Sequence, residues 1–341
     1  MSPTPRFNHL YLVTHTDLDG IASAAIAARK LGRSEEGYSV LFAEPYNVDQ
    51  VIAGLEEHLS KGDLVVVSDL GVNRDSFQGL LEALRGLTGV GAYVKWFDHH
   101  IWSEEERNAL LDLGVELHVD TSTCAAGVVA KYLEGPVDDF VEKLVDAVCS
   151  ADLWRWTNPL SGKLFRIVGE RSQSWEWKER LVGKFASGVI WDNELDARLE
   201  EYVTQELEGY NRVLSTVASR RANGYLVVAA YKYFRGPPSS SMIGALLLSR
   251  YNADIALILR NDGGLSLRSR RVNVQVVARA LGGGGHPRAS GAKLKMPLLV
   301  RIGSKIYPKL ASIYASQTVS KIVSRLGREV EVVVASARSA I

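Results

Sequence analysis

Two short stretches of this chain combine residue types that carry out chemistry. Asp98-His99-His100 places a carboxylate and two imidazoles directly after an apolar run, and residues 282–288 read Gly-Gly-Gly-Gly-His-Pro-Arg. A carboxylate beside imidazoles is a donor set for divalent cations that act on phosphates. Consecutive glycines let backbone N–H groups approach an anion with no Cβ in the way. The two stretches therefore indicate metal-assisted chemistry on a phosphorylated substrate.

Further carboxylates follow other apolar runs in the first half of the chain. The run 10–13 leads into His15-Thr16-Asp17-Leu18-Asp19-Gly20, Asp69 follows the run 64–67, and Asp152 follows an apolar helical stretch. If the runs are parallel strands, their carboxyl ends meet at one edge of a sheet. Carboxylates gathered there repel one another unless cations neutralise them. The candidate metal ligands are His15, Asp17, Asp19, Asp69, His99 and Asp152.

The first ~155 residues alternate short apolar strands with helical stretches. Apolar strands separated by helices are typical of a parallel sheet covered on both faces. Ser103 and Glu106 have the spacing of a capping box at the start of one helix. The expected strands are 10–13, 38–42, 64–67, 93–97 and 115–119, and further helices are expected over 21–31, 47–59, 123–133 and 137–153.

The remainder of the chain is expected to form a connector and a smaller domain. An irregular segment carries Trp154, Trp156, Trp175 and Trp177, which either pack between domains or stack bases. A long polar helix over 193–222 would join the domains. Beyond it, strands are expected over 225–233, 255–259, 264–269 and 330–334, and helices over 242–250, 274–281 and 310–326.

The fold class expected from these patterns is α/β, with a parallel-sheet domain and flanking helices. A smaller α/β domain follows it, joined by a helical connector. The chain of 341 residues is long enough for two domains. The expected boundaries are 1–160 for the first domain, 161–222 for the connector and 223–341 for the second domain.

Composition places the chain among ordinary globular proteins, with 46% hydrophobic and 23% charged residues. No apolar run reaches the ~20 residues of a membrane span, and residues 1–6 lack the features of a signal peptide. We therefore expect a cytoplasmic protein without a membrane partner. Cys124 and Cys149 are expected to be buried thiols, with no disulfide framework.

The formal net charge of +1 conceals a separation of charge along the chain. Residues 222–341 carry 18 Lys and Arg against 4 Asp and Glu, whereas residues 1–221 carry 22 against 35. The separation favours a polyanionic partner for the second part, although its basic surface would also complement the acidic first part. Arginines gather near the glycine run, where charge-assisted hydrogen bonds would hold phosphate. The candidate substrate-binding residues are Arg268, Arg270, Gly283, Gly284, Gly285, His286 and Arg288.

The motifs, taken in their order, resemble those of the DHH phosphoesterase superfamily. The segment 15–20, Asp69, Asp98-His99-His100 and Asp152 are similar to its four motifs. Leu265-Ser266-Leu267-Arg268-Ser269 and residues 283–291 are similar to its DHHA1 companion domain. Only one residue separates His15 from Asp17, which is closer to the RecJ-like and archaeal exonuclease pattern than to that of many short-oligonucleotide, nanoRNase-like members.

The resemblance implies a pair of metal ions, usually Mn²⁺, with Mg²⁺ as the alternative. Asp69 would bridge the ions, His15 and Asp17 would hold one, and the other would be held by Asp19, His99 and Asp152. The resemblance also implies two catalytic residues: Asp98 would orient His99, and His100 would face the scissile phosphate. A water shared by two cations becomes hydroxide near neutral pH and can attack phosphorus in line.

Three functions are compatible with these residues. The first is a two-metal phosphodiesterase that hydrolyses single-stranded or short RNA or DNA exonucleolytically. The second is a small-molecule phosphoesterase acting on a cyclic dinucleotide, a linear dinucleotide or a 3′-phosphoadenosine phosphate, which needs little extended basic surface. The third is a non-catalytic nucleic-acid-binding subunit, which the complete ligand set disfavours. The basic second part favours the first function. A homodimer and a helicase or repair partner are compatible with the sequence, which fixes neither.

Overall fold

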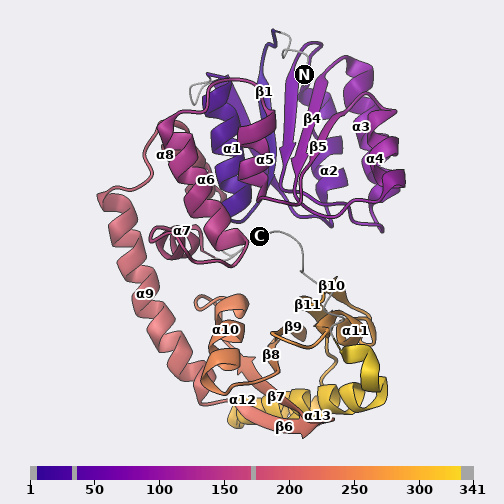
Figure 1. The fold of residues 1–341 in the computed structure, drawn as a ribbon, viewed down its shortest axis with the longest axis vertical. Coiled ribbons are helices and arrows are strands. Elements are labelled where there is room, and N and C mark those ends of the chain that lie inside the picture. The colour runs from indigo at the N-terminus through magenta and orange to yellow at the C-terminus, as the bar shows by residue number, and fades with distance from the viewer. Residues whose placement is uncertain (1–5, 33–36, 170–173, 332–341) are drawn as a thin grey trace, which may run out of the picture. The chain divides into compact units, whose positions relative to one another are not determined.

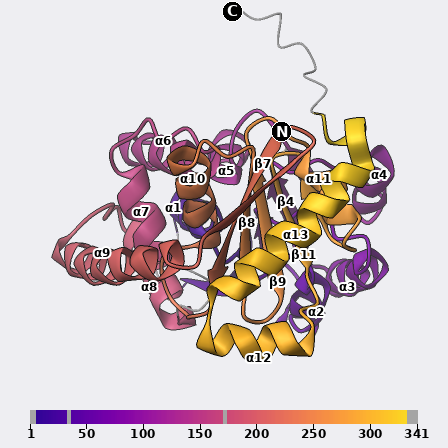
Figure 2. The ribbon, with the colours of Figure 1, turned by 90° about the horizontal axis from the view of Figure 1, so that it is seen from below.

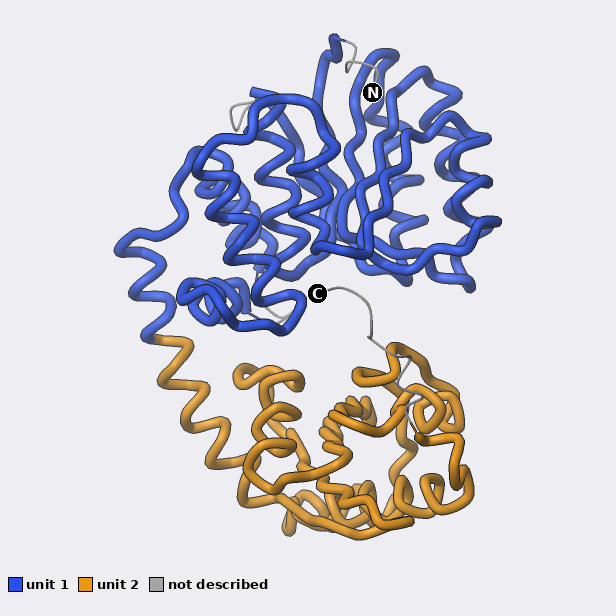
Figure 3. The backbone as a smooth tube through the Cα atoms, viewed as in Figure 1, with its two compact units in different colours: residues 1–200 blue, residues 201–341 orange. Residues whose placement is uncertain are grey.

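The chain divides into two compact units. In a computed structural model, the described residues are 6–32, 37–169 and 174–331. Unit 1 comprises residues 1–200 and unit 2 residues 201–341 (Figure 3). The division falls inside helix α9 (Asn193–Leu214). The expected connector, 161–222, thus contributes residues to both units, and its boundaries stay a prediction.

A five-stranded parallel sheet forms the centre of unit 1 (Figure 1). Its strand order is β2-β1-β3-β4-β5, so the order changes direction at β1. In α/β sheets of this kind, ligands bind beyond the carboxyl ends of the strands at such a switch point. The strands are β1 (Leu10–His15), β2 (Tyr38–Ala43), β3 (Leu64–Ser68), β4 (Tyr93–Asp98) and β5 (Glu116–Val119).

Helices cover both faces of this sheet and create a hydrophobic core on each side. The expected α/β fold with flanking helices is confirmed, as is the capping box of Ser103 and Glu106. One core is formed with α1 (Leu18–Lys30), α5 (Ala125–Tyr132), α6 (Asp139–Asp152), α7 (Ser161–Val168) and α8 (Trp175–Ala186). The other is formed with α2 (Val48–Ala53), η2 (Glu56–His58), α3 (Phe77–Val90) and α4 (Glu104–Leu111).

A six-stranded mixed sheet forms unit 2, with the order β10-β11-β9-β8-β7-β6. Helix α13 (Lys309–Leu326) crosses one face (Figure 2), and α10 (Ser240–Arg250) packs on the other. The smaller α/β domain is thus confirmed. The strands are β6 (Ala218–Ala222), β7 (Tyr225–Lys232), β8 (Ile255–Arg260), β9 (Gly264–Ser269), β10 (Gly284–His286) and β11 (Ala289–Lys293). The remaining elements are α11 (Val274–Arg279), α12 (Leu298–Ile306) and η3 (Gly327–Val330).

Several expected elements differ from those in the structure. The segment that was expected to be irregular contains α7 and α8, and the sequence patterns missed α3 and α12. The long helix expected over 193–222 ends at Leu214, because Asn223 and Gly224 form the turn of a hairpin between β6 and β7. Both turn residues have positive φ, which is the backbone that Asn-Gly favours. Most of the strand expected over 330–334 lies outside the described residues.

The two cysteines form a disulfide, so the expectation of thiols was wrong. Cys124 immediately precedes α5, and Cys149 lies in the last turn of α6. Their Cα atoms are 5.1 Å apart, within bonding range. Both side chains are buried, as expected. The pairing depends on α5 and α6 lying side by side, which is a tertiary contact that the cysteine spacing does not reveal.

Among the described residues, no helix combines the length and the apolar character that crossing a membrane requires.

Candidate metal centre

The candidate metal ligands lie beyond the carboxyl ends of three neighbouring strands. His15 ends β1, Asp69 follows β3, and His99 follows β4. Asp17 and Asp19 stand at the start of α1, directly after β1, and Asp152 ends α6. The structure therefore brings all six candidates to the switch point of the sheet.

The first cluster contains His15, Asp17 and Asp69, each of which offers a ligand atom within 4.8 Å of the others. His15 Nδ1 lies 3.0 Å from Asp17 Oδ2 and 3.4 Å from Asp69 Oδ2. Asp17 is the N-cap of α1, and its Oδ1 accepts hydrogen bonds from the N–H groups of Asp19 and Gly20. Burial opposes ionisation of Asp17, but the ion pair with His15 holds its pKa below the ordinary value. One carboxylate oxygen thus orders the helix while the other faces the cluster.

The second cluster contains Asp19, His99 and Asp152, again within 4.8 Å of one another. His99 Nε2 lies 3.8 Å from Asp19 Oδ2 and 3.7 Å from Asp152 Oδ2. Asp19 accepts hydrogen bonds from the N–H groups of Ala125 (2.7 Å) and Ala126 (2.9 Å) at the N-terminus of α5. The start of α5 therefore fixes the orientation of this carboxylate.

Asp69 lies between the two clusters. Its Oδ1 is 3.5 Å from His99 Nε2, and its Oδ2 faces His15. The buried Oδ2 accepts no hydrogen bond within the described part of the chain. The backbone has φ = 57°, a conformation that Asp and Asn tolerate better than most residues. A buried carboxylate oxygen without a hydrogen-bond donor, between imidazoles and other carboxylates, fits a hard divalent cation.

Excess negative charge in the centre perturbs several pKa values. Burial, together with repulsion from Asp69 and Asp152, raises the pKa of Asp19 well above its ordinary value. Burial, followed by repulsion from Asp69 and Asp17, raises the pKa of Asp152 to about 7. Burial would lower the pKa of His99, but the carboxylates of Asp69, Asp19 and Asp152 outweigh it and raise that pKa to about 10. A bound cation would relieve this repulsion.

The motif glycine at position 20 permits a close approach between α1 and β1. A Cβ atom at Gly20 would lie 2.3 Å from the carbonyl oxygen of His15. The hydroxyl of Thr14 donates to the carbonyl oxygen of Gly20 at 2.7 Å. A larger residue here would push the start of α1, with Asp17 and Asp19, away from the strand.

Asp98 does not orient His99, as the resemblance implied, so that expectation was wrong. Asp98 Oδ1 pairs with His100 Nδ1 at 2.8 Å, and Asp98 Oδ2 accepts a hydrogen bond from Trp102 Nε1 at 2.7 Å. Side chains two positions apart share a side of an extended segment, whereas neighbours point to opposite sides. Because Asp98 pairs with Nδ1 of His100, Nε2 is the ring nitrogen that remains for other partners. The sequence patterns gave Trp102 no role.

Two further buried charges adjoin the segment 15–17 and were missed by the sequence patterns. Glu44 follows β2 and approaches His15, so the strand-end rule that identified Asp69 applies to it as well. Lys178 of α8 is fully buried, and its Nζ donates to the carbonyl oxygen of Thr16 at 2.7 Å. Because this part of the chain was expected to be irregular, no pattern pointed to Lys178.

The candidate substrate residues of unit 2 lie on β9 and on the hairpin next to it. Arg268 pairs in register with Ala289, which brings β9 beside the residues that follow the glycine run. The guanidinium of Arg268 donates to Ser241 Oγ at 2.8 Å, at the start of α10. Arg270 directly follows the end of β9 at Ser269. Arg270, His286 and Arg288 are exposed.

The glycine run forms an edge strand as well as a turn. Gly284 and Gly285 pair with Gly291 and Ser290 across the β10–β11 hairpin. The N–H of Gly283 donates to the carbonyl oxygen of Ala278, in the last turn of α11, at 2.8 Å. A Cβ at Gly283 would lie 2.1 Å from the carbonyl oxygen of Gly291. The expected backbone cradle for an anion is therefore partly occupied by the protein's own carbonyl groups.

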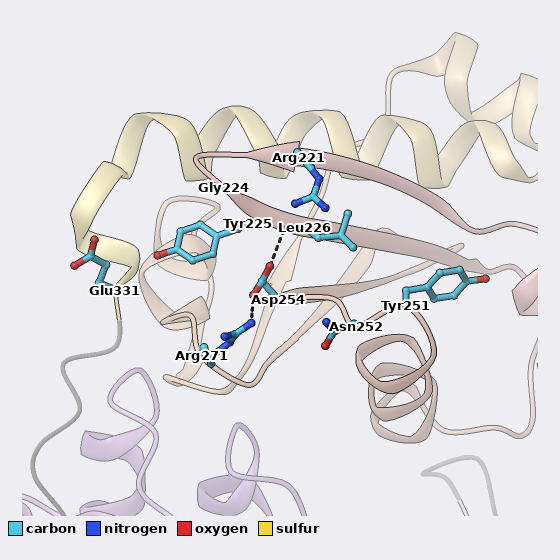
Figure 4. A pocket seen from close by; sticks show the side chains of 9 residues that line it. All are labelled: Arg221, Gly224, Tyr225, Leu226, Tyr251, Asn252, Asp254, Arg271 and Glu331. Atoms are coloured by element: carbon cyan, nitrogen blue, oxygen red, sulfur yellow. Dashed lines mark hydrogen bonds and ion pairs between the residues drawn. The ribbon is translucent and has the colours of Figure 1, made fainter.

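A separate pocket of about 710 Å³ lies at one end of the sheet in unit 2 (Figure 4). Asp254 is one of the residues that line it, and its carboxylate accepts hydrogen bonds from the N–H of Leu226 and from Arg271. None of the candidate substrate residues lines this pocket. Its walls are completed by Arg221, Gly224, Tyr225, Tyr251, Asn252 and Glu331.

Comparison with known proteins gives one match to a domain family and one curated relative. The sequence model of the DHHA1 domain matches residues 223–306. The oligoribonuclease NrnB of Bacillus subtilis (strain 168) is 21% identical over 313 residues, which cover 84% of this chain and 72% of that protein.

Solved structures share the fold at low sequence identity. RecJ of Thermus thermophilus, in complex with Mn²⁺, matches 93% of this chain and 52% of its own length, with a TM-score of 0.59 and 16% identity. The pGpG-specific phosphodiesterase PggH of Vibrio cholerae matches 89% of this chain and 99% of its own length, with a TM-score of 0.53 and 14% identity. At these sequence identities the similarity is evidence for a shared fold alone.

Proposed function

We propose, from the support that the motifs, the DHHA1 match and the fold give to the DHH–DHHA1 superfamily, that this chain is a metal-dependent phosphodiesterase. The family resemblance that the motifs predicted is confirmed by these comparisons. The proposed reaction is exonucleolytic hydrolysis of single-stranded or short oligonucleotides. Unit 1 would hold the metal ions and the scissile phosphate, and unit 2 would bind the nucleotide strand.

The observation that carries this proposal is a pair of ligand clusters that meet at Asp69. One cluster is His15, Asp17 and Asp69, and the other is Asp19, His99 and Asp152. Asp69 faces a histidine of each cluster, with one oxygen towards His15 and the other towards His99. Two adjoining sets of ligands, with the carboxylate of Asp69 between them, suit a pair of divalent cations. When bound, such a pair activates water and stabilises charge on the attacking and leaving oxygens of a phosphate.

We propose Mn²⁺ as the metal and Mg²⁺ as the weaker alternative. The clusters contain carboxylates and two imidazoles, His15 and His99. Imidazole nitrogen is a softer donor than oxygen and is less suited to Mg²⁺, which favours oxygen ligands and retained waters. The proposed count of two ions assigns one to each cluster. A third group, Asp69, His99 and His100, overlaps both clusters.

His100 is proposed to contact the phosphate that is cleaved. Its Nδ1 is held by Asp98, and its side chain is 37% exposed, more than that of His99. Burial would lower the pKa of His100, but the carboxylate of Asp98 raises it and so favours the imidazolium, which carries a proton on each nitrogen. In this form Nε2 would donate a hydrogen bond to a phosphate oxygen and neutralise charge that develops there. Asp98, itself fixed by Trp102, would keep the ring in this orientation.

Unit 2 is proposed to hold the strand through its cationic surface. No acidic residue occurs between Asp262 and Glu329, a stretch that includes Arg268, Arg270 and Arg288. Each phosphate that such residues neutralise releases counterions and adds to affinity. A substrate with several phosphates uses this surface more fully than a dinucleotide does, so oligonucleotides are the preferred substrate class.

The experiment uses the full chain with Mn²⁺ and end-labelled RNA and DNA single strands of two to about twenty-four nucleotides. Each strand is labelled at either end, and EDTA and Asp69→Asn provide the inactive controls. A ladder of shortened products, absent in both controls, is the expected result, and the labelled end gives the direction of digestion. Cleavage confined to dinucleotides would favour the small-molecule phosphoesterase. Tight binding of strands without any cleavage would contradict an enzymatic role.

A further inference from the structure

Glu44 lies beside the first metal cluster although it belongs to none of the motifs. Strands β1 and β2 are parallel, with His15 opposite Ala43, so the next pair beyond the strand ends is Thr16 and Glu44. The side chain of Glu44 is only 7% exposed. A buried carboxylate is costly unless nearby donors stabilise its charge. The contacts of this side chain therefore indicate what it does.

Both oxygens of the Glu44 carboxylate contact the segment that carries the first ligands. Oε1 accepts a hydrogen bond from the hydroxyl of Thr16 at 2.7 Å, and Oε2 lies 3.4 Å from His15 Nε2. The backbone of Glu44 is fixed in turn, because its N–H donates to Asn47 Oδ1 at 2.8 Å and its carbonyl oxygen accepts from the N–H of Asn47 at 3.0 Å. Glu44 is thus held both at its carboxylate and at its backbone.

The imidazole of His15 lies between Glu44 on one side and the candidate metal cluster on the other. Its Nδ1 faces Asp17 and Asp69, and its Nε2 faces Glu44. A neutral imidazole carries one N–H and one lone pair. Carboxylates can only accept, and they face both nitrogens. A cation at the first cluster would need the lone pair of Nδ1, and Glu44 is then the carboxylate that accepts the hydrogen bond from the proton on Nε2. The lone pair then lies on Nδ1, which faces the cluster.

We propose that Glu44 is a positioning residue of the metal site, which holds His15 so that Nδ1 is the atom offered to the cation. The inference rests on the proposed function, because it assumes that His15 binds an ion. Carboxylates that orient a ligating histidine in this way change metal affinity by about 10–100-fold when they are removed. Glu44 would act on the first cluster and leave the second cluster unchanged.

The first test is a calorimetric titration of the metal-free full chain with Mn²⁺. For Glu44→Ala we expect one Mn²⁺ equivalent to bind ~10–100-fold more weakly and the other to stay within ~3-fold of wild type. Glu44→Gln keeps a carbonyl oxygen as acceptor and should recover part of the loss. Asp63→Ala is the matched control, because Asp63 is also buried and accepts two backbone hydrogen bonds before β3, far along the strand from the cluster.

The second test uses the wild-type chain and does not depend on a variant that folds. Long-range ¹H–¹⁵N spectra of the Mg²⁺-loaded protein should show the His15 proton on Nε2. A proton on Nδ1, or Mn²⁺ affinities of Glu44→Ala equal to those of wild type, would overturn the inference while leaving the proposed function intact. A wild-type chain that binds no Mn²⁺ would instead overturn the proposed function itself, and this inference with it.

Discussion

At the scale of single residues, Asp69 must both adopt an unusual backbone conformation and supply a carboxylate for the proposed metal site. Its φ of 57° lies in the left-handed region, and its carboxylate is buried between two histidines. Most residues with a Cβ adopt this backbone only at a cost, whereas Asn and Asp do so more readily. A substitution at this position therefore has a backbone effect that must be separated from its effect on metal binding.

The first prediction concerns Asp69→Asn and Asp69→Ala. Both remove the shared carboxylate, so both should weaken Mn²⁺ binding and lower turnover by at least ~100-fold, the upper end of what changes around a metal ligand cost. Only the alanine variant should also lose about 1 kcal/mol of unfolding free energy in EDTA, because alanine tolerates the left-handed backbone poorly. Urea unfolding and Mn²⁺ titration of the two variants check this. Equal stability of the two would show that the backbone conformation is not constrained there.

The candidate ligands could be predicted from the sequence because each follows a recognisable apolar run. His15, Asp69 and His99 follow β1, β3 and β4, and parallel strands must bring their carboxyl ends together. The partners of these side chains could not be predicted in the same way. Asp98 pairs with His100 and Trp102 because of side-chain directions after the strand, which depend on the path of the loop.

At the scale of elements, turn chemistry and long-range packing limited the prediction. All five strands of the first sheet were expected within a few residues, since buried strands are short apolar runs bounded by polar residues. Helix α9 was extended too far because the polar residues of β6 were read as its last turns. The disulfide between Cys124 and Cys149 depends on the packing of α5 against α6, which local patterns do not contain.

The second prediction concerns the glycine run at the start of β10. A Cβ at Gly283 would meet the carbonyl oxygen of Gly291 at 2.1 Å, whereas a Cβ at Gly284 would meet nothing within 4 Å. Gly283→Ala should therefore destabilise unit 2 by ~1–3 kcal/mol, as overpacking does, and should weaken binding of single strands. Gly284→Ala is the matched control and should stay within ~0.5 kcal/mol of wild type. Thermal unfolding and a strand-binding assay compare them; similar losses in both would argue against the tight approach at Gly283.

The third prediction concerns Asp138, which joins α6 to α1. Asp138 caps α6 by accepting the N–H of Val141 at 2.9 Å, and it pairs with Arg29 of α1 at 2.6 Å. The hydrogen bond from Arg29 and the N–H of Val141 lower the pKa of Asp138 below its ordinary value of 3.8. The folded state thus gains stability from the ionised carboxylate. This contribution is complete above pH 3.8 and is lost as the pH falls through the lowered value in the folded state.

Asp138→Asn should be less stable than wild type by about 0.5 kcal/mol at pH 7, as is typical of exposed ion pairs. The difference should shrink as the pH falls below 3.8, because the unfolded chain then takes up a proton that the folded carboxylate still resists. Urea unfolding between pH 7 and pH 3 measures it, with Asp139→Asn as a control of equal charge in the same helix turn. A difference that stays constant with pH would exclude the ion pair as its source.

At the scale of the whole molecule, the two units differ in charge as well as in fold. The acidic residues lie mostly before residue 222, where the candidate metal ligands are, and the basic excess follows it. The charge separation was evident from the sequence because it requires no knowledge of contacts. The homodimer and the helicase or repair partner stay predictions, since the surfaces that would form them leave no pattern in the sequence.

The fourth prediction concerns the salt dependence of strand binding. If Arg270 and Arg288 each neutralise one phosphate, their double alanine variant should reduce the slope of log K against log salt by ~1.4, since each contact with a single strand contributes ~0.7. The control is the double variant Arg301→Ala/Lys305→Ala on α12, which removes the same charge from exposed positions elsewhere in unit 2. Fluorescence anisotropy over a range of salt concentrations measures both. Equal slopes for the two variants would assign the effect to net charge alone.

The stretch without acidic residues has a consequence for peptide mapping. A protease that cleaves after Asp and Glu has no site between Asp262 and Glu329, so digestion of the unfolded chain would release this stretch as one peptide. That peptide carries Arg268, Arg270, His286 and Arg288 together. A photo-cross-linked nucleotide bound by these residues would therefore shift the mass of a single fragment, and trypsin, which cuts at the arginines, would then divide that fragment to locate the attachment.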